Sequence, residues 1–352
     1  MEYKKEIEEL VSMVVQEGAS DIHLSQGRTP FIRVSGALIP LVKRPVLSAT
    51  DMKGLLNEFL SEKNKIDLEK DREVDFSYNL TDVRFRGNAF YRQTNLSIAL
   101  RLIPKTIRTL AELNLPPVLE SFTRRQQGFF LCVGPIGQGK TTTLASLIEI
   151  INQTRTEHIL TIEDPVEYLY ESKKSVIDQR EVGIDTPDFY SALVAMFRED
   201  IDVCLLGEMR DINTISTAVT AAETGHLVFS TLHTNNAAQT INRIIDSFSP
   251  AQQDQIRVQI AGSLTGIFSQ RLIPRISGGL IPSYELLINN NAVSNLIREK
   301  RIHEINTVIE TSSGEGMIDM NHSLAELVRA GEITVESAYL NSLNPKVLER
   351  LI

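Results

Sequence analysis

Several residue types are scarce in this chain of 352 residues, and each scarcity excludes something. There is no tryptophan, and there are only two cysteines and six histidines. Cys132 and Cys204 lie singly in apolar runs, so we expect buried core thiols rather than a disulfide or a paired-cysteine zinc site. The histidines form no His-Glu-x-x-His pattern, which leaves metal binding through them poorly supported.

Long apolar runs and an excess of positive charge are also missing. No stretch approaches the roughly 18 apolar residues that a membrane-spanning helix needs. Residues 1–10 are charged throughout, unlike the apolar core of a signal peptide. A net charge of −9 argues against a bulk electrostatic grip on nucleic acid. We therefore expect a soluble cytoplasmic protein.

The length exceeds the roughly 250–300 residues at which one core stops growing, so two domains are predicted. Residues 1–103 indicate a small α+β domain. It opens with an amphipathic helix that ends near Gly18, followed by short strands with a turn at Ser35-Gly36, a helix capped by Ser48 and Asp51, and further strands around a turn at 79–82. The first helix should bury one face, made of Ile7, Leu10, Val11 and Val14.

Residues 104–117 contain three prolines and are predicted to be a linker. From there to 352 a larger domain is expected. Its apolar runs alternate with helical patterns, which indicates a parallel sheet covered by helices. From about Pro250 the pattern is interpreted as helical, with short turns around 277–279 and 314–316. The apolar runs cover 129–133, 158–162, 203–206 and 227–229.

The strongest chemical signal is a phosphate-binding loop that fits G-x-x-x-x-G-K-[ST] at every fixed position. It follows an apolar strand and opens a helix, the context that gives the motif its meaning. Lys140 would reach the β- and γ-phosphates, and the Thr141 hydroxyl would bind Mg²⁺. The predicted nucleotide-binding residues are Gly134, Pro135, Ile136, Gly137, Gln138, Gly139, Lys140, Thr141 and Thr142.

Two acidic clusters follow predicted strands and would meet this loop at the carboxyl edge of the sheet. Glu163 and Glu167 belong to the first, and Glu208 to the second. Asp211 is interpreted as a helix cap. Gly207 stands where many P-loop enzymes carry an Asp that helps to hold Mg²⁺, so the metal would depend more on Thr141, phosphate oxygens and water.

Two histidines, His226 and His233, flank the apolar strand that comes next. Imidazole at a sheet edge can donate to a γ-phosphate or couple it to a neighbouring segment. For His226 a role as an ordinary, internally satisfied histidine stays open.

These boxes occur in the order seen in secretion ATPases of the type II and type IV pilus superfamily, which the chain resembles. The resemblance rests on the P-loop, the 163–167 acidic box, 207–211 and 222–234, and it extends to Gly18–Ser25 near the N-terminus. It implies a PAS-like small domain, a RecA-like P-loop ATPase domain and a ring of six subunits.

The retraction branch of the superfamily is favoured over the extension branch. The chain has no tetracysteine zinc insertion, and 292–299 resembles the C-terminal motif that retraction ATPases require. Two positions depart from the family pattern: Ser294 stands in place of Arg, and Ile201 in place of Pro.

The resemblance also implies a mechanism and partners. Glu208 would polarise the attacking water with help from Glu163 or Glu167, while His226 and His233 would link nucleotide state to domain motion. A homohexamer that uses ATP and Mg²⁺ would drive the pilus platform protein at the inner face of the cytoplasmic membrane, with a paralogous ATPase as a second partner. The arginines that could stabilise phosphoryl charge are Arg210 and Arg198, and from the small domain Arg84, Arg86 and Arg101.

Two other functions remain open at this point. One is a RecA-like nucleic-acid translocase, which the acidic balance and the absence of tryptophan disfavour. The other is an accessory paralogue that binds nucleotide without hydrolysing it, which the intact Lys140, Thr141, Glu163 and Glu208 disfavour.

Overall fold

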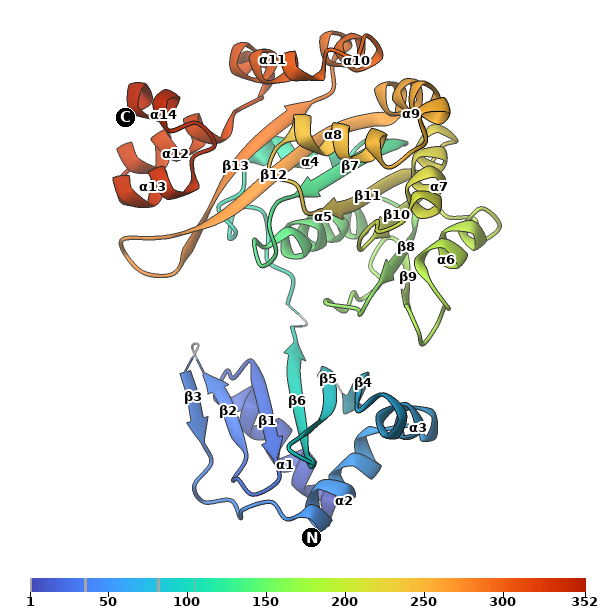
Figure 1. The fold of residues 1–352 in the computed structure, drawn as a ribbon, viewed down its shortest axis with the longest axis vertical. Coiled ribbons are helices and arrows are strands. Elements are labelled where there is room, and N and C mark those ends of the chain that lie inside the picture. Colours follow the sequence, from blue (N-terminus) through green and yellow to red (C-terminus); the bar gives the residue numbers. More distant parts are fainter. Residues whose placement is uncertain (1, 35–36, 81–82, 105) are drawn as a thin grey trace. The chain divides into compact units, whose positions relative to one another are not determined.

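The computed structural model describes residues 2–352 apart from 35–36, 81–82 and 105. By their internal contacts these residues form two compact units (Figure 1). The smaller unit runs up to residue 105 and takes in Glu167–Leu169. The larger unit combines Thr106–Val166 with Tyr170–Ile352. The turns predicted at Ser35-Gly36 and within 79–82 fall wholly or partly outside the described residues.

The smaller unit is an antiparallel sheet of six strands, ordered β3-β2-β1-β6-β5-β4, with three helices. The buried face predicted for the first helix is confirmed, and so is the Ser48–Asp51 capping box. The helices are α1 (Tyr3–Gln16), α2 (Ala49–Phe59) and α3 (Glu62–Asp71); the strands are β1 (Asp21–Ser25), β2 (Phe31–Val34), β3 (Ala37–Pro40), β4 (Glu73–Leu80), β5 (Val83–Arg92) and β6 (Asn95–Ile103).

The larger unit is built on a sheet of seven strands, ordered β13-β12-β7-β11-β10-β8-β9. All neighbours are parallel except the edge strand β13, which pairs antiparallel with β12. The strands are β7 (Gly128–Val133), β8 (His158–Glu163), β9 (Val176–Glu181), β10 (Val203–Leu206), β11 (Leu227–Leu232), β12 (Leu264–Pro274) and β13 (Leu280–Ile288). The four apolar runs therefore form the predicted parallel strands.

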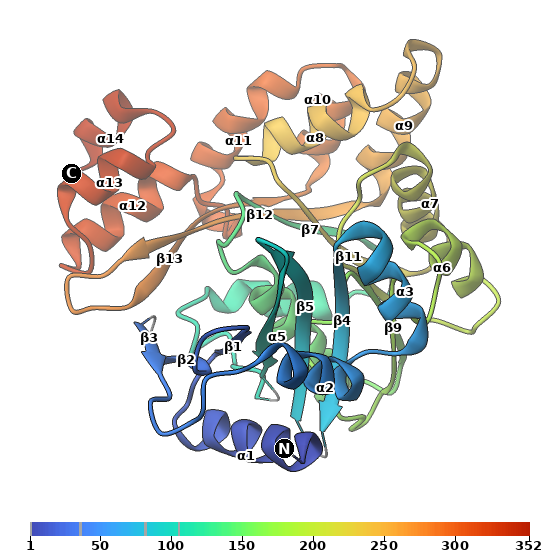
Figure 2. The ribbon, with the colours of Figure 1, turned by 60° about the horizontal axis from the view of Figure 1, so that its bottom comes forward.

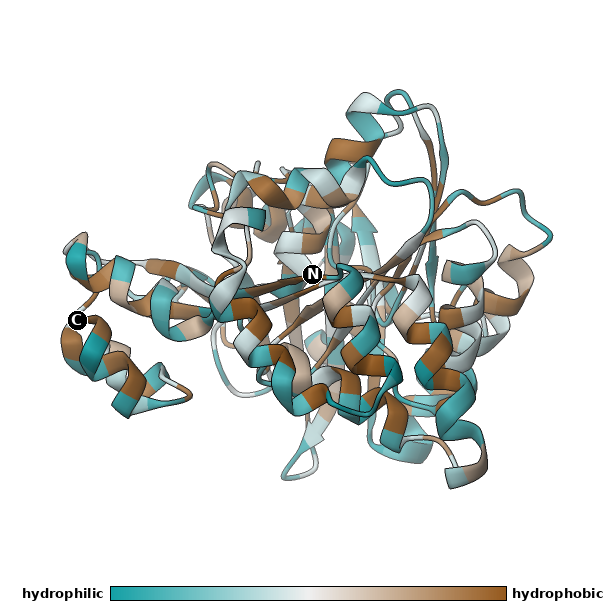
Figure 3. Cartoon of the chain, turned by 90° about the horizontal axis from the view of Figure 1, so that it is seen from above, coloured by the Kyte–Doolittle hydropathy of each residue, from teal (hydrophilic) through white to brown (hydrophobic). Residues whose placement is uncertain are grey.

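Helices cover both faces of this sheet, and the central strands are therefore buried on both sides. Along β7, Phe129, Leu131 and Val133 join one hydrophobic core, and Phe130 and Cys132 the other. Both cysteines are fully buried, as predicted. The helices themselves alternate hydrophobic and hydrophilic stretches (Figure 3).

The helices and turns of the larger unit begin with η1 (Pro117–Leu119), α4 (Glu120–Thr123), α5 (Lys140–Thr154), α6 (Phe189–Met196), α7 (Ile212–Glu223), α8 (Ala237–Asp246) and α9 (Pro250–Ser263). After β13 follow α10 (Asn291–Arg298), η2 (Ile302–Glu304), α11 (Ile305–Thr311), η3 (Ser313–Glu315), α12 (Met320–Arg329), α13 (Val335–Asn341) and α14 (Pro345–Leu351). Among the described residues no helix is both long and apolar enough to cross a bilayer.

The helical interpretation from Pro250 onward is wrong for residues 264–288, which form the long β12–β13 hairpin (Figure 2). Strand β12 begins directly after α9, and its apolar residues are buried beside β7. A fully buried apolar segment has no alternation of apolar and polar residues, so its sequence does not distinguish a strand from a helix. The predicted turn at 277–279 is confirmed, and Gly278 and Gly279 supply its positive φ angles. Helices α12 and α13 pack against the hairpin, and α14 packs on α12.

Residues of the predicted linker contribute to the core of the larger unit. Leu110 and Leu115 are buried in the cluster that contains the inner face of α5. The Ser146 hydroxyl of α5 donates a hydrogen bond to the Arg108 carbonyl. The segment from 106 onward is thus packed beside the helix that starts at the P-loop.

Candidate nucleotide-binding and catalytic site

The P-loop connects β7 to α5, and glycine is required where it turns. Gly134 has a φ of 145°, and a Cβ there would lie 2.4 Å from the Gln270 carbonyl oxygen. Gly139 has a φ of 77° directly before the first residue of α5. The backbone can therefore wrap closely and aim N–H groups toward an anion at the start of a 15-residue helix.

Lys140 lies at the centre of this loop and is buried. Its Nζ donates to the carbonyls of Gly134, at 2.9 Å, and Pro135, at 2.8 Å. The same atom lies 3.3 Å from Nδ1 of His233. The lysine charge is thus held inside the loop, where a polyphosphate would be bound.

Two glutamines attach the P-loop to β12, and no sequence motif singles out Gln270. Its carboxamide accepts a hydrogen bond from Thr143 at 2.6 Å and donates to the Gln138 carbonyl at 2.8 Å. The Gln138 side chain in turn accepts from the Leu272 amide at 2.7 Å. Gln270 is 3% exposed, so these bonds form without competition from water.

The two acidic clusters lie at the carboxyl ends of neighbouring strands. Glu163 ends β8, is buried, and accepts from the Thr161 hydroxyl at 2.7 Å. Glu208 follows β10, the strand between β8 and β11. Its carboxylate pairs with Arg210, whose guanidinium also lies 3.9 Å from Asp164. The hydrogen bond to Glu208 raises the pKa of Arg210.

His233 follows β11 and connects the lysine to the carboxylate. Its Nε2 lies 4.0 Å from Glu208 Oε2, on the other side of the ring from Lys140. Burial and then the Lys140 charge lower the pKa of His233, although Glu208 and the Gly134 carbonyl oppose the shift. The imidazole is therefore neutral at pH 7. Lys140, His233, Glu208 and Arg210 form one continuous polar group.

His226 and Arg198 lie at the opposite edge of the sheet. His226 precedes β11 whereas His233 follows it, so the six-residue strand separates them by roughly 20 Å. His226 packs edge-on against Phe197 and contacts the Ala221 carbonyl. Arg198 is exposed in the turn before β10. The strand direction already implied this separation, which means that neither residue reaches the nucleotide site of its own chain.

The three candidate arginines of the smaller unit lie on adjacent strands. Arg86 of β5 pairs in register with Arg101 of β6, and Arg101 donates to Asp21 at 2.9 Å. Arg84 donates to the Ser77 hydroxyl. Glu167 is exposed and clusters with this same unit. Catalytic roles for these four residues stay predictions.

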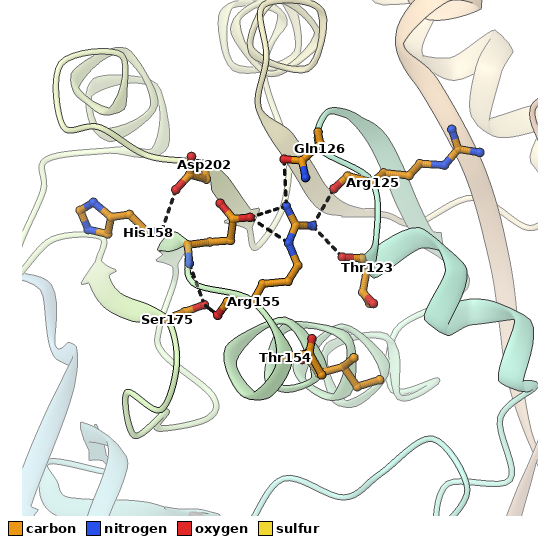
Figure 4. Close-up of polar contacts among 10 residues, drawn as sticks. Thr123, Arg125, Gln126, Thr154, Arg155, His158, Ser175 and Asp202 are labelled. Atoms are coloured by element: carbon orange, nitrogen blue, oxygen red, sulfur yellow. Dashed lines mark hydrogen bonds and ion pairs between the residues drawn. The ribbon is translucent and has the colours of Figure 1, made fainter.

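The far end of α5 is fixed by Arg155 (Figure 4). Its guanidinium donates to the carbonyls of Thr123 and Arg125, at 2.7 and 2.6 Å, and to the Glu157 carboxylate. The Arg155 carbonyl accepts from Ser175. The helix that opens at the P-loop is therefore held at both ends, by Gln270 and by Arg155.

A hollow of 560 Å³ borders the P-loop on the side of the predicted linker. It is large enough for a nucleoside. Linear motifs do not reveal it, because its walls come from three distant segments. Those walls include Arg108, Leu113, Thr142, Gln270, Leu272 and Arg275.

The residues present fit a magnesium ion bound jointly with phosphates. No group of three acidic, histidine or cysteine side chains that could hold a metal occurs in the described part of the chain. The Thr141 hydroxyl at the start of α5 is the group with which the P-loop would bind such an ion. At Gly207 a Cβ would lie 3.2 Å from the Ile162 carbonyl, which leaves little room for an aspartate there.

A mainly parallel sheet with this loop after its central strand and carboxylates beside it defines a RecA-like P-loop ATPase. The family model described as "Type II/IV secretion system protein" matches residues 2–329. The chain belongs to this family, as its motifs predicted.

Relatives of the chain are similar over nearly its whole length. The type IV pilus retraction ATPase PilT of Pseudomonas aeruginosa is 41% identical over 95% of this chain and 97% of its own length. A twitching motility protein of Neisseria gonorrhoeae is 44% identical over 90% of this chain and 85% of its own. A crystal structure of the pilus retraction motor PilT with bound ADP has a TM-score of 0.92 at 46% identity, covering 97% of this chain and 98% of that one.

Proposed function

We propose that this chain is the ATP-hydrolysing motor of type IV pilus retraction, acting as a homohexamer. The observation that carries the proposal is the polar group of Lys140, His233 and Glu208 at one edge of the sheet. In this group the lysine can bind phosphate, the imidazole can couple the phosphate to the neighbouring segment, and the carboxylate can orient the attacking water. The relatives whose names specify retraction and twitching extend over both units of the chain.

Each residue has a distinct task. The P-loop amides and Lys140 hold the β- and γ-phosphates, and the Thr141 hydroxyl would hold Mg²⁺, whose charge would offset that of the phosphates. Glu208 orients and deprotonates the attacking water, and Arg210, which pairs with it, lies where it can stabilise phosphoryl charge. The buried Glu163 supports it from the adjacent strand.

His233 lies between Lys140 and Glu208, so any change at the γ-phosphate reaches the segment that follows β11. A second charge-stabilising arginine, besides Arg210, would come from a neighbouring subunit, since Arg198 lies at the opposite sheet edge of its own chain. Ring formation is then a condition for fast hydrolysis. The protein would act in the cytoplasm at the inner face of the membrane on the platform protein, together with a paralogous ATPase.

The C-terminal motif supports the retraction branch. Helix α10 buries Val293, Leu296 and Ile297 and leaves Asn295 and Arg298 exposed for a partner. Ser294, which stands in place of the family's Arg, donates to the Ala261 carbonyl at 2.8 Å and so ties α10 to α9. Ile201, which stands in place of Pro, is buried in the core.

The test is complementation of a piliated host that lacks its own retraction ATPase. The wild-type chain should form hexamers, restore twitching and reduce the number of surface pili. Glu208→Gln should form hexamers and restore neither. Hexamers that hydrolyse ATP but leave twitching absent would contradict retraction as the function while leaving the ATPase assignment intact.

A further inference from the structure

A buried carboxylate, Glu285 of β13, lies outside the nucleotide site and has no role in the chemistry described so far. It is 4% exposed, and its Oε1 accepts a hydrogen bond from the Ala237 amide at 2.7 Å. Ala237 is the first residue of the ten-residue helix α8, and Asn236 caps it. A negative charge at this end of a helix is favourable. Glu285 thus holds the start of α8.

A second bond from the same hairpin holds the residues just before α8. Ser269 of β12 lies directly opposite Glu285 in the register of the two strands. Its hydroxyl donates to the Asn235 carbonyl at 2.9 Å. Two neighbouring residues of the hairpin, Ser269 and Glu285, therefore both form hydrogen bonds with the segment 235–237.

The segment 235–237 closely follows His233, a member of the polar group, in the chain. Only Thr234 separates His233 from Asn235, and Thr234 is itself buried and bonded to Thr240 of α8 at 2.6 Å. The chain between His233 and α8 has little freedom to shift. The position of His233 against Lys140 and Glu208 therefore depends on where α8 begins.

The other side of Glu285 faces a hollow of 220 Å³ between the hairpin and the C-terminal helices. Asp319, the cap of α12, disfavours its charge across this space, and Arg271 of β12 favours it. Glu310 of α11 also lines the hollow. Burial, which is the largest cause, raises the pKa of Glu285 to about 7. Its charge therefore changes within the physiological range.

We propose that Glu285 is a positioning residue for ATP hydrolysis, which fixes the start of α8 and through it sets His233 against Lys140 and Glu208. The inference rests on the proposed function, because it requires His233 to work in the nucleotide site. It also makes the C-terminal helices, which border the same hollow, a place from which hydrolysis can be tuned.

The two protonation states of Glu285 hold α8 differently. An ionised carboxylate is a stronger acceptor for the Ala237 amide than a neutral carboxyl group. The anchor therefore tightens as the pH rises through about 7. Burial and the Lys140 charge lower the pKa of His233 below its usual range, so its imidazole is neutral at pH 7. Activity that depends on the anchor should rise with pH above 7, where the charge of His233 no longer changes.

The experiment compares kcat and KM for ATP from pH 6 to pH 8.5 in the wild type and three variants. Glu285→Gln keeps the volume and removes the charge. It should lower kcat about tenfold at pH 8 and less than about twofold at pH 6, in line with the difference between charged and neutral hydrogen bonds. KM should change less than kcat.

Ser269→Ala and Glu310→Gln are the matched variants. Ser269→Ala loosens the same segment without a titrating group, so it should lower kcat by a similar factor at every pH. Glu310→Gln removes an exposed carboxylate that lines the same hollow, and should behave as the wild type. A Glu285→Gln effect that is equal at pH 6 and pH 8, or that Glu310→Gln reproduces, overturns the proposal.

Hydrogen exchange of the peptide 233–240 provides a readout that needs no hydrolysis. At pH 8 this peptide should exchange faster in Glu285→Gln than in the wild type, and equally in Glu310→Gln. If the wild type hydrolyses no ATP, the proposed function fails, and exchange still decides whether Glu285 anchors the segment. Equal exchange in the wild type and Glu285→Gln overturns the proposal whatever the activity.

Discussion

The Nζ of Lys140 lies 3.3 Å from Nδ1 of His233, which joins the phosphate-binding loop to the end of β11. An ammonium group has no acceptor, so this contact is favourable only while Nδ1 carries no proton. The lysine charge and burial both disfavour the imidazolium and lower the pKa of His233. The charge of Lys140 therefore affects the protonation of His233.

Replacing the lysine should therefore change the titration of the histidine. In Lys140→Met the positive charge is gone, so the His233 pKa should rise compared with the wild type. The measurement is an NMR titration of the imidazole C–H signals, assigned with His233→Gln. Lys346→Met, an exposed lysine on α14, is the control. A His233 pKa that is unchanged or lower in Lys140→Met would show that the two groups do not interact.

The glycines of the P-loop should differ in their tolerance of a side chain. Gly134→Ala would place its Cβ against the Gln270 carbonyl, whereas a Cβ at Gly137 meets nothing within 4 Å. Both positions have a positive φ, so each substitution costs on the order of 1 kcal/mol of backbone strain. Gly134→Ala should cost more and lose most of its nucleotide affinity.

Urea unfolding and binding of a fluorescent ATP analogue measure both effects. Gly137→Ala should bind nucleotide within a few-fold of the wild type. Equal losses in the two variants would mean that close packing on β12 does not shape the loop.

The attachment of the P-loop to β12 predicts an effect of Gln270, a residue outside the motif. Gln270→Leu removes the buried acceptor of the Thr143 hydroxyl, which keeps its bond to the Gly139 carbonyl, and the donor to the Gln138 carbonyl. Each lost hydrogen bond costs about 0.5–1.5 kcal/mol, so both stability and nucleotide affinity should fall. Gln259→Leu, which removes an exposed bond to Glu223, is the control and should change neither. Unaltered affinity in Gln270→Leu would refute the importance of this attachment.

Arg210 should matter for rate and little for stability. Its side chain is 67% exposed, and exposed ion pairs contribute about 0–1 kcal/mol. Arg210→Gln should therefore shift the free energy of unfolding by no more than that, while kcat falls at least about tenfold through the loss of an arginine beside Glu208. Arg301→Gln, which removes another arginine between two glutamates, should leave kcat unchanged. Equal kcat in both variants would exclude Arg210 from the chemistry.

The parts of the site that the sequence predicts are those that local patterns encode. The P-loop, Glu163, Glu208 and His233 each follow a buried strand, and parallel strands bring their carboxyl ends together. The strand that carries His233 also separates it from His226, a consequence of chain direction that the spacing of the two histidines did not make obvious. Burial of both cysteines was likewise predictable from their apolar neighbours.

The remaining parts depend on contacts between distant segments. Gln270 and Glu285 act through the β12–β13 hairpin, which the sequence pattern suggested to be helical because a run buried on both faces has no period. The nucleoside hollow likewise combines the 108–115 segment with this hairpin. A charge-stabilising arginine from another subunit lies beyond any pattern in one chain.

Magnesium-dependent ATP hydrolysis by the hexamer, measured together with ATP binding, tests the central claim most directly. The proteins compared are the wild type, Glu208→Gln and Glu304→Gln, the last an arginine-paired glutamate on the outer surface. We expect Glu208→Gln to bind ATP within a few-fold of the wild type and to hydrolyse it at least about 100-fold more slowly, and Glu304→Gln to match the wild type in both. A wild-type hexamer that binds ATP without hydrolysing it, or a Glu208→Gln variant that hydrolyses it normally, would contradict the account.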